Sequence, residues 1–177
     1  MADVTSDTRV SPARTGYAIF SEATSGAVDY ERIREITNSL VPFGRFVGVD
    51  ITEVGPDRAV VEIPADRNLT NHLGTVHAGA LFLAADIAGA AALAGALAPR
   101  LARVEYTVVR DARSTFRKPA VGRVRAIATV DEREARRVLA STAAEQFDLD
   151  GKALLYDDAD VLVAKFRFDY ACSIAAS

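Results

Sequence analysis

The stretch NHLGTVHAGALFLAAD, residues 71–86, begins a nearly uncharged segment that continues to Pro99. The segment is rich in Ala and Gly, which predicts a long buried helix from Val76 to about Ala98. Asp86 lies near the middle of this helix. Burying a lone carboxylate costs several kcal/mol unless the group is paired, hydrogen-bonded or neutralised. A carboxylate at this position therefore needs a reason, and catalysis is one candidate.

The same segment needs a comparison with a membrane span. Residues 73–98 approach the length that crosses a bilayer. However, Ala and Gly outnumber Leu and Ile, and Asp86 would lie near the bilayer centre. The sequence therefore favours a buried helix of a soluble domain, and no membrane partner is expected.

The chain has 177 residues, which fits one domain with tails. We expect a flexible N-terminal tail over residues 1–27, which packing can order in part. A single domain over 28–170 and a C-terminal tail over 171–177 complete the chain. Half of the residues are apolar, enough for a sizeable core, and the net charge of −3 implies no particular partner. Because no basic stripe with interleaved aromatic residues occurs, nucleic acid is not an expected partner.

Cysteine usage and the N-terminus suggest where the protein works. Cys172 is the only cysteine, so no intrachain disulfide can form, which fits a reducing compartment. The first residues, MADVTSDTRVSPARTG, contain no apolar segment typical of a secretory signal. We therefore expect a cytoplasmic protein.

The order of the predicted elements indicates the fold class. A helix over 28–40 ends at Pro42, and two strands over 46–55 and 58–64 meet at a turn. After the long helix, strands are predicted over 103–118, 123–132, 136–149 and 153–168, with a turn at 148–152. Successive strands with short connections predict an antiparallel sheet. The fold class is therefore α+β, with the sheet wrapped around the long helix, whose small side chains allow close packing.

Helix geometry separates the two polar features of the opening stretch. Asp86 follows His77 by nine residues, which is about 900° of rotation and about 13.5 Å along the axis. The two ends of this segment therefore cannot converge on one small substrate. A helix N-terminus suits a developing oxyanion, and a half-buried carboxylate suits a base or a nucleophile. The simplest way to combine them is a symmetric dimer, in which Asp86 of one chain faces the Ala78 end of the other.

The spacing of the polar and glycine residues matches a known motif. It comprises Asn71, Gly74, His77, Gly79 and Asp86, with Leu81 and Phe82 between. The motif resembles the signature of hotdog-fold acyl-CoA thioesterases of the phenylacetyl-CoA thioesterase (PaaI-like) type. That signature reads N-x-x-G-x-x-H-G-G, then six residues, then D. The resemblance covers roughly residues 30–168, and the motif is also similar to a branch of that superfamily whose function is unknown.

The resemblance implies a hotdog fold and hydrolysis of an acyl-CoA or acyl-carrier-protein thioester. It implies a homodimer or a dimer of dimers, with no metal and no cofactor. Asp86 would be the general base or nucleophile, with water activation the preferred route, and Asn71 of the facing subunit would orient water or substrate. The backbone N–H of Ala78 would polarise the thioester carbonyl. Gly79 would allow close approach, and His77 would shape the turn.

Further residues are candidates for binding the substrate. Gly74 and Phe82 lie within the motif. The basic group Arg113, Arg117 and Lys118 could contact the phosphates of coenzyme A, although such residues more often form the solvated face of a strand.

Each motif residue also has a purely structural interpretation. His77 could hydrogen-bond the preceding loop, and Asn71 and Gly74 suggest turn chemistry. Asp86 could cap a neighbouring loop.

Two departures from the family pattern leave other functions open. Ala78 replaces the first glycine of the usual His-Gly-Gly, and Val109 stands near the position where some members carry Ser or Thr. These features favour a non-catalytic acyl-binding or scaffold protein, and a hotdog hydratase or dehydratase is a further alternative. No G-x-S-x-G nucleophile motif occurs. His72, His77 and Asp86 lack the arrangement of a zinc site, so none is expected.

Overall fold

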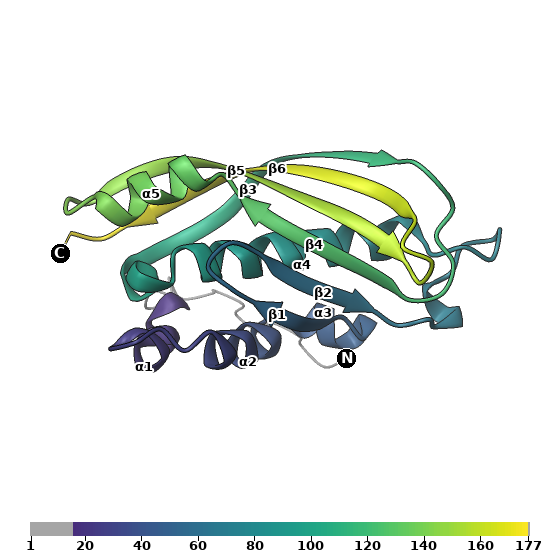
Figure 1. The fold of residues 1–177 in the computed structure, drawn as a ribbon, viewed down its shortest axis with the longest axis horizontal. Coiled ribbons are helices and arrows are strands. Elements are labelled where there is room, and N and C mark those ends of the chain that lie inside the picture. Colours follow the sequence, from purple (N-terminus) through teal and green to yellow (C-terminus); the bar gives the residue numbers. More distant parts are fainter. Residues whose placement is uncertain (1–15, 177) are drawn as a thin grey trace, which may run out of the picture.

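A six-stranded antiparallel sheet curls around one long helix in the computed structural model, which describes residues 16–176 (Figure 1). The strand order is β1-β2-β4-β5-β6-β3, and every neighbouring pair is antiparallel. The strands are β1 (Asp50–Val54), β2 (Ala59–Ile63), β3 (Val104–Phe116), β4 (Val124–Val130), β5 (Glu145–Asp157) and β6 (Leu162–Ile174). The predicted α+β class, with a sheet wrapped around a central helix, is confirmed.

The central helix α4 (Ala78–Ala96) forms the core with the inner face of the sheet. Thirteen of its 19 residues are buried, most of them Ala. Small residues allow the close approach, because a Cβ atom at Gly95 would lie 2.1 Å from the carbonyl oxygen of Gly55. By length and composition α4 could also cross a membrane, but 67% of its most apolar window is buried inside the protein. This burial favours a core helix over a membrane span.

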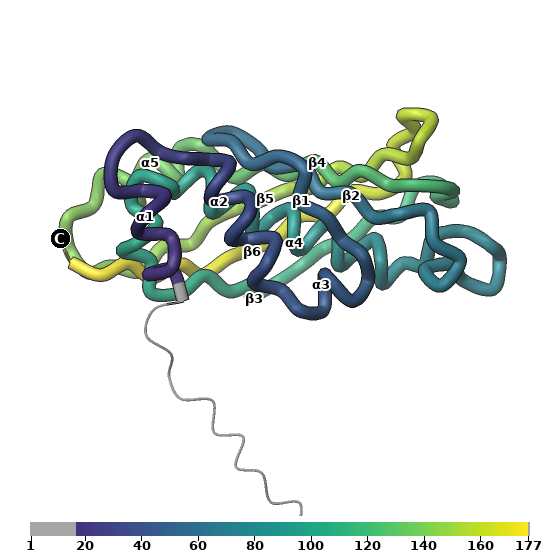
Figure 2. The backbone as a smooth tube through the Cα atoms, turned by 90° about the horizontal axis from the view of Figure 1, so that it is seen from below, coloured from purple at the N-terminus to yellow at the C-terminus, as the bar shows by residue number. Residues whose placement is uncertain are grey.

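Three short helices lie on the other side of α4 from the sheet: α1 (Ser21–Thr24), α2 (Tyr30–Leu40) and α3 (Pro42–Val47) (Figures 1 and 2). The α3 helix packs closely on α4, because a Cβ atom at Gly44 would lie 2.7 Å from Cδ1 of Ile87. The sequence placed the start of a strand at residue 46. That start is wrong, because Pro42 begins a helix and Gly48, with φ of 80°, ends it.

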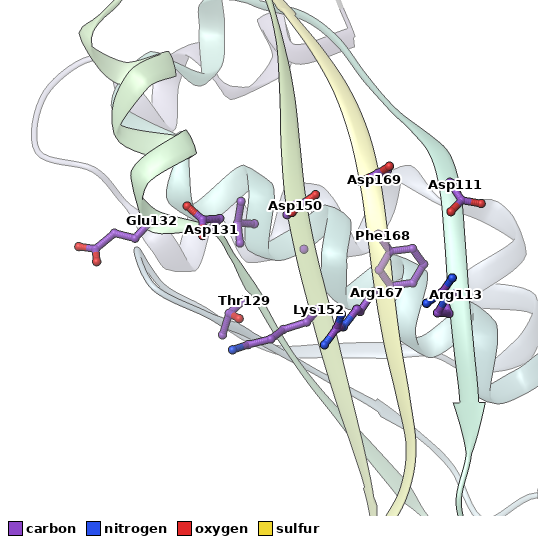
Figure 3. Close-up of a pocket in the computed structure, with 12 residues that line it drawn as sticks. Asp111, Arg113, Thr129, Asp131, Glu132, Asp150, Lys152, Arg167, Phe168 and Asp169 are labelled. Carbon is purple, nitrogen blue, oxygen red and sulfur yellow. The ribbon is translucent and has the colours of Figure 1, made fainter.

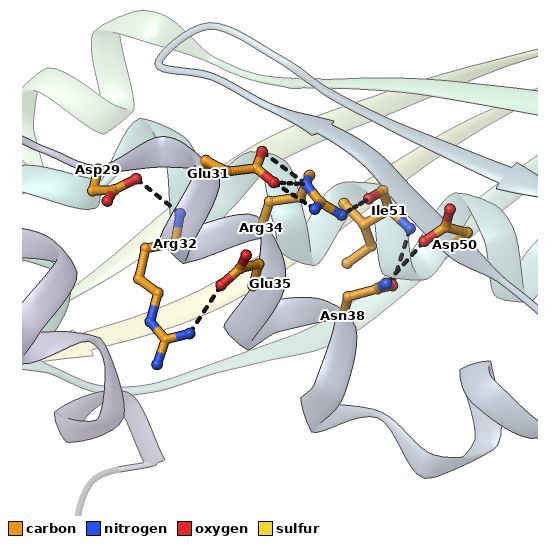
Figure 4. A network of polar contacts seen from close by, with 8 residues as sticks. All are labelled: Asp29, Glu31, Arg32, Arg34, Glu35, Asn38, Asp50 and Ile51. Atoms are coloured by element: carbon orange, nitrogen blue, oxygen red, sulfur yellow. Dashed lines mark hydrogen bonds and ion pairs between the residues drawn. The ribbon is translucent and has the colours of Figure 1, made fainter.

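Helix α2 covers one edge of the sheet through a polar network (Figure 4). Nη1 of Arg34 donates to the carbonyl oxygen of Ile51 at 2.9 Å, and the Ile51 N–H donates to Oδ1 of Asn38 at 3.0 Å. Nδ2 of Asn38 also donates to Oδ1 of Asp50 at 2.8 Å. Side chains thus occupy backbone groups of edge strand β1, which prevents another strand from pairing there.

The opposite edge of the sheet, β3, is open by comparison. Helix α4 packs chiefly beneath β2, β4 and β5, so β3 extends beyond it. Most residues of β3 are exposed, including Tyr106, Val108, Val109 and Phe116. An exposed edge strand of 13 residues that carries several large apolar side chains is a surface that soluble proteins usually cover.

Both predicted tails are shorter than expected, as far as the described residues extend. A 3₁₀ helix (Gly16–Phe20) precedes α1, and the side chains of Phe20 and Ala23 are buried in the core. At the other end, β6 continues to a fully buried Ile174. Residues 1–15 of the predicted N-terminal tail lie outside the described residues. Two further 3₁₀ helices, Arg67–Leu69 and Ala98–Arg103, flank α4.

The region after β4 differs most from the prediction. Residues Glu132–Ala140 form helix α5, where a strand over 136–149 was predicted. Asp131 caps this helix by accepting hydrogen bonds from the N–H groups of Arg133 and Glu134. Residues 148–152, predicted to turn, lie inside β5, and the chain reverses instead near Asp160, with φ of 57°.

Candidate active site

One stripe of α4 is exposed, and Asp86 lies on it. The exposed stripe consists of Gly79, Phe82, Asp86 and Ala90, which recur at the three- and four-residue spacing of one helix face. Asp86 is partly buried, and burial raises the pKa of its carboxyl above the ordinary value. Within residues 16–176, no hydrogen bond or ion pair engages this carboxylate. A carboxylate with these properties suits a general base.

An aromatic cluster lies beside Asp86 and consists of Phe82, Phe116, Phe166 and Phe168. The Phe82 ring packs edge-on against Phe166 and Phe168, with ring centroids 5.7 and 6.1 Å apart. The Phe116 ring, on β3, packs edge-on against Phe166 at 5.8 Å. Phe82 and Phe116 remain 39% and 50% exposed. The cluster therefore gives the Asp86 side of the molecule an accessible apolar surface.

Tyr170 continues this aromatic row along β6, and sequence reasoning missed it. Its side chain is 2% exposed, and its hydroxyl has no hydrogen-bond partner within the described residues. The ring fits between two glycines: Cβ atoms at Gly89 and Gly151 would lie 2.0 Å from its hydroxyl oxygen and 2.7 Å from its Cε2. Burial and, to a lesser extent, the charge of Asp86 raise the pKa of the Tyr170 hydroxyl. Both glycines are visible in the sequence, but only the fold brings them to one tyrosine.

The contact between Tyr170 and Gly89 predicts a coupled effect on stability. Gly89→Ala should lower the free energy of unfolding by about 1–3 kcal/mol, because the new methyl group overlaps the hydroxyl. Tyr170→Phe should be neutral or stabilising, because it removes an unpaired buried hydroxyl. In the double variant the Ala should cost clearly less than in the wild type, as measured by urea unfolding. Additive costs would contradict this account.

The start of α4 is shaped by His77. Its Nδ1 accepts a hydrogen bond from the Gly79 N–H at 2.9 Å and so caps the helix. A Cβ atom at position 79 would lie 3.1 Å from this nitrogen, so glycine gives the ring room. The N–H of Ala78 has no acceptor inside the helix, because it occupies the first helical position. The His77 cap engages the Gly79 N–H. Of these two N–H groups, the one of Ala78 therefore remains available for an oxyanion.

Asn71 and Gly74 shape the loop that precedes α4. Oδ1 of Asn71 accepts from the N–H groups of Leu73 and Thr75 at 2.9 and 3.3 Å, and its Nδ2 donates to Oγ1 of Thr75 at 2.9 Å. Gly74 adopts φ of 73°, which favours glycine. The turn interpretation of both residues is thus observed within the chain, and most of the Asn71 side chain is already engaged.

The two halves of the predicted site are not brought together within one chain. Ala78 and Asp86 are eight residues apart on one straight helix, which corresponds to about 12 Å along the axis. The catalytic roles of these residues, and of Asn71, His77 and Gly79, therefore stay predictions that require a second subunit.

The three residues of the predicted basic group lie on β3 and directly after it. Arg113 points to the outer face of the sheet, away from α4, where it lines a cavity of about 590 Å³ (Figure 3). Arg117 and Lys118 follow the end of β3, where both backbone N–H groups donate to the carbonyl oxygen of Val163. Strand alternation places Arg113 on the opposite face of the sheet from Asp86, and the binding of coenzyme A phosphates by these three residues stays a prediction.

Other chemistries find little support in the described residues. Between residues 16 and 176, no group of three or more His, Cys, Asp or Glu side chains is placed to hold a metal ion. Cys172 is buried, and burial raises the pKa of its thiol to about 11, which disfavours a nucleophilic thiolate.

Comparison with known proteins places the chain in a family. A model of the family described as "Domain of unknown function (DUF4442)" matches residues 30–171. The chain belongs to the DUF4442 family. No curated protein matches this DUF4442 chain.

Solved structures resemble the DUF4442 chain over most of its length. A Pseudomonas aeruginosa protein of unknown function, titled a probable thioesterase, is 25% identical with a TM-score of 0.66, covering 81% of this chain and 95% of its own. A thioesterase family protein from Silicibacter pomeroyi is 18% identical with a TM-score of 0.65, covering 83% and 100%. The Escherichia coli PaaI protein from the phenylacetic acid degradation operon is 19% identical with a TM-score of 0.56, covering 79% and 92%. The predicted hotdog fold and the resemblance to PaaI-like proteins are confirmed.

Proposed function

We propose that this DUF4442 protein hydrolyses an acyl thioester of coenzyme A or of an acyl carrier protein. The observation that carries the proposal is the position of Asp86. It is a partly buried carboxylate without a partner among the described residues, beside an accessible aromatic cluster. The fold is that of the thioesterase-family structures described above. The apolar cluster would receive the acyl group.

The proposed reaction uses Asp86 as a general base. The carboxylate takes a proton from a water molecule, whose oxygen attacks the thioester carbonyl carbon. The Ala78 N–H of a second subunit stabilises the resulting oxyanion. The C–S bond then breaks, and the proton held by Asp86 passes to the departing thiolate. The products are a carboxylic acid and a free thiol. No metal or cofactor is required.

We further propose that the working unit is a homodimer joined through β3 and α4. Side chains of α2 occupy the β1 edge, whereas the β3 edge is open, and its inner face is open beyond Thr107, which hydrogen-bonds Tyr17. The exposed stripe of α4 runs beside that open face. A second copy related by a two-fold axis would cover both surfaces and bring its Ala78 N–H toward Asp86. A homodimer explains why one chain holds only half of the site.

The direct test is a thiol-release assay with a panel of acyl-CoA and acyl-carrier-protein thioesters. Release that depends on acyl chain and is lost without Asp86 would support hydrolysis. Binding of acyl-CoA without thiol release would instead favour the non-catalytic acyl-binding alternative.

A further inference from the structure

Two rows of like charge cross the outer face of the sheet (Figure 3). The register aligns Asp150 of β5 with Asp169 of β6 and Asp169 with Asp111 of β3, which we call the acidic row. Two residues along each strand, the register aligns Lys152 with Arg167 and Arg167 with Arg113, which we call the basic row. All six side chains are exposed, whereas Leu149 and Phe168, which alternate with them, are buried toward α4.

Among the described residues, direct ion pairs do not neutralise either row. Like charges directly opposite each other on neighbouring strands are destabilising. Among the ion pairs of residues 16–176, none joins the acidic row to the basic row. Asp148, two residues before Asp150 on β5, does have an ion-pair partner. Its Oδ1 lies 2.9 Å from Nη2 of Arg110 on β3.

Crowding within the acidic row is visible at Asp150. A hydrogen bond to Asp169 is the largest cause that raises the pKa of Asp150, followed by burial and the neighbouring negative charges. This direction is the one expected for two like charges that the register places side by side.

Symmetry offers one partner that would neutralise both rows together. Consider a second copy whose sheet faces this one, related by a two-fold axis that runs parallel to the rows and midway between them. The acidic row of each copy then lies over the basic row of the other. Both rows cross β5, β6 and β3 in the same order. Each acidic row therefore makes three pairs of opposite charge with the other copy: Asp150 with its Lys152, Asp169 with its Arg167 and Asp111 with its Arg113. An axis parallel to the strands would instead place like charges together, so the pattern selects one orientation.

We propose that the outer face of the sheet docks against the same face of a second copy of this chain, with each acidic row paired to a basic row. The charge complementarity of the two rows selects this occupant over a small anion or cation, either of which would neutralise one row only. The surface lies on the opposite face of the sheet from Asp86 and α4. It therefore leaves the β3–α4 dimer surface free, and the two contacts together would join four chains.

The test measures assembly rather than turnover, so it stands apart from the proposed thioesterase activity. An acid-faced variant carries Lys152→Glu, Arg167→Glu and Arg113→Glu, and a base-faced variant carries Asp150→Lys, Asp169→Lys and Asp111→Lys. Sedimentation velocity at low salt should show that each variant alone has lost the largest species of the wild type. An equimolar mixture of the two should regain it. Salt at about 1 M, where the Debye length is about 3 Å, should dissociate the same species in the wild type.

Single changes keep the test valid if a triple variant fails to fold. Arg167→Glu and Asp169→Lys should each weaken the largest species and should restore it when mixed. Arg45→Glu, an equal charge change on exposed α3, is the matched control and should leave assembly unchanged. Full assembly of both single variants at low salt would overturn the proposal. So would variants that fold but fail to associate when mixed.

Discussion

Asp86→Asn is expected to lower the turnover of the best thioester substrate by about 10²-fold or more, the usual effect of losing a general base. Asn keeps the shape of the side chain and removes its basicity. The measurement is the steady-state kcat in the thiol-release assay, with the oligomeric state checked by sedimentation. Ala90→Ser, a small polar change on the same exposed stripe, is the matched control for altering that surface. Full turnover by Asp86→Asn would return the carboxylate to a structural role.

The pH dependence of Asp86 gives this prediction two further signatures. Burial raises its pKa, so kcat/KM should fall with decreasing pH at a value above the ordinary range of an aspartate. For stability, a raised carboxyl pKa in the folded state favours folding at low pH, and this contribution is lost as the pH rises through that pKa. Asn resembles the neutral form, so Asp86→Asn should raise the thermal unfolding temperature at neutral pH. An inactive variant that is more stable would exclude misfolding as the cause.

The central helix and its carboxylate could be predicted because their signals are local. An uncharged Ala-rich segment between a polar loop and Pro99 is typical of a core helix. The motif spacing indicates Asp86 as the candidate catalytic residue. Helix α5 was missed because its residues were read together with the strand that follows, although Asp131 and the charged residues after it form a helix start. The turn predicted at Gly151 was wrong because that glycine makes room for the Tyr170 ring rather than for a bend.

The remaining parts of the site depend on contacts between distant segments. Tyr170 and Gly89 meet only after β6 packs on α4, so neither residue alone indicates a site. Strand alternation decides that Arg113 faces away from Asp86, and a bulge between Val109 and Asp111 shifts that alternation along β3. The two charge rows likewise exist only through the register of three strands.

Two inactive variants should restore activity to each other if the site is shared between subunits. The first is Asp86→Asn. The second is Ala78→Pro, which deletes the proposed oxyanion donor and fits the first position of a helix. His77, with φ of −64° and ψ of 138°, already has the extended conformation that a following proline requires. Ala78→Pro alone should lose about 10²- to 10³-fold in kcat. Ala78→Gly retains the N–H and should stay active.

A mixed dimer of the two variants contains one site with both defects and one site with neither. Random assortment in a two-fold dimer makes about half of the dimers mixed, so the refolded mixture should regain about a quarter of the wild-type activity. Mixed dimers purified through two different affinity tags should reach about half. Mixing Asp86→Asn with Asp86→Ala is the matched control and should regain nothing, because no site then has its carboxylate. If mixed dimers form and stay inactive, the carboxylate and the N–H act within one chain or not at all, and the shared site is wrong.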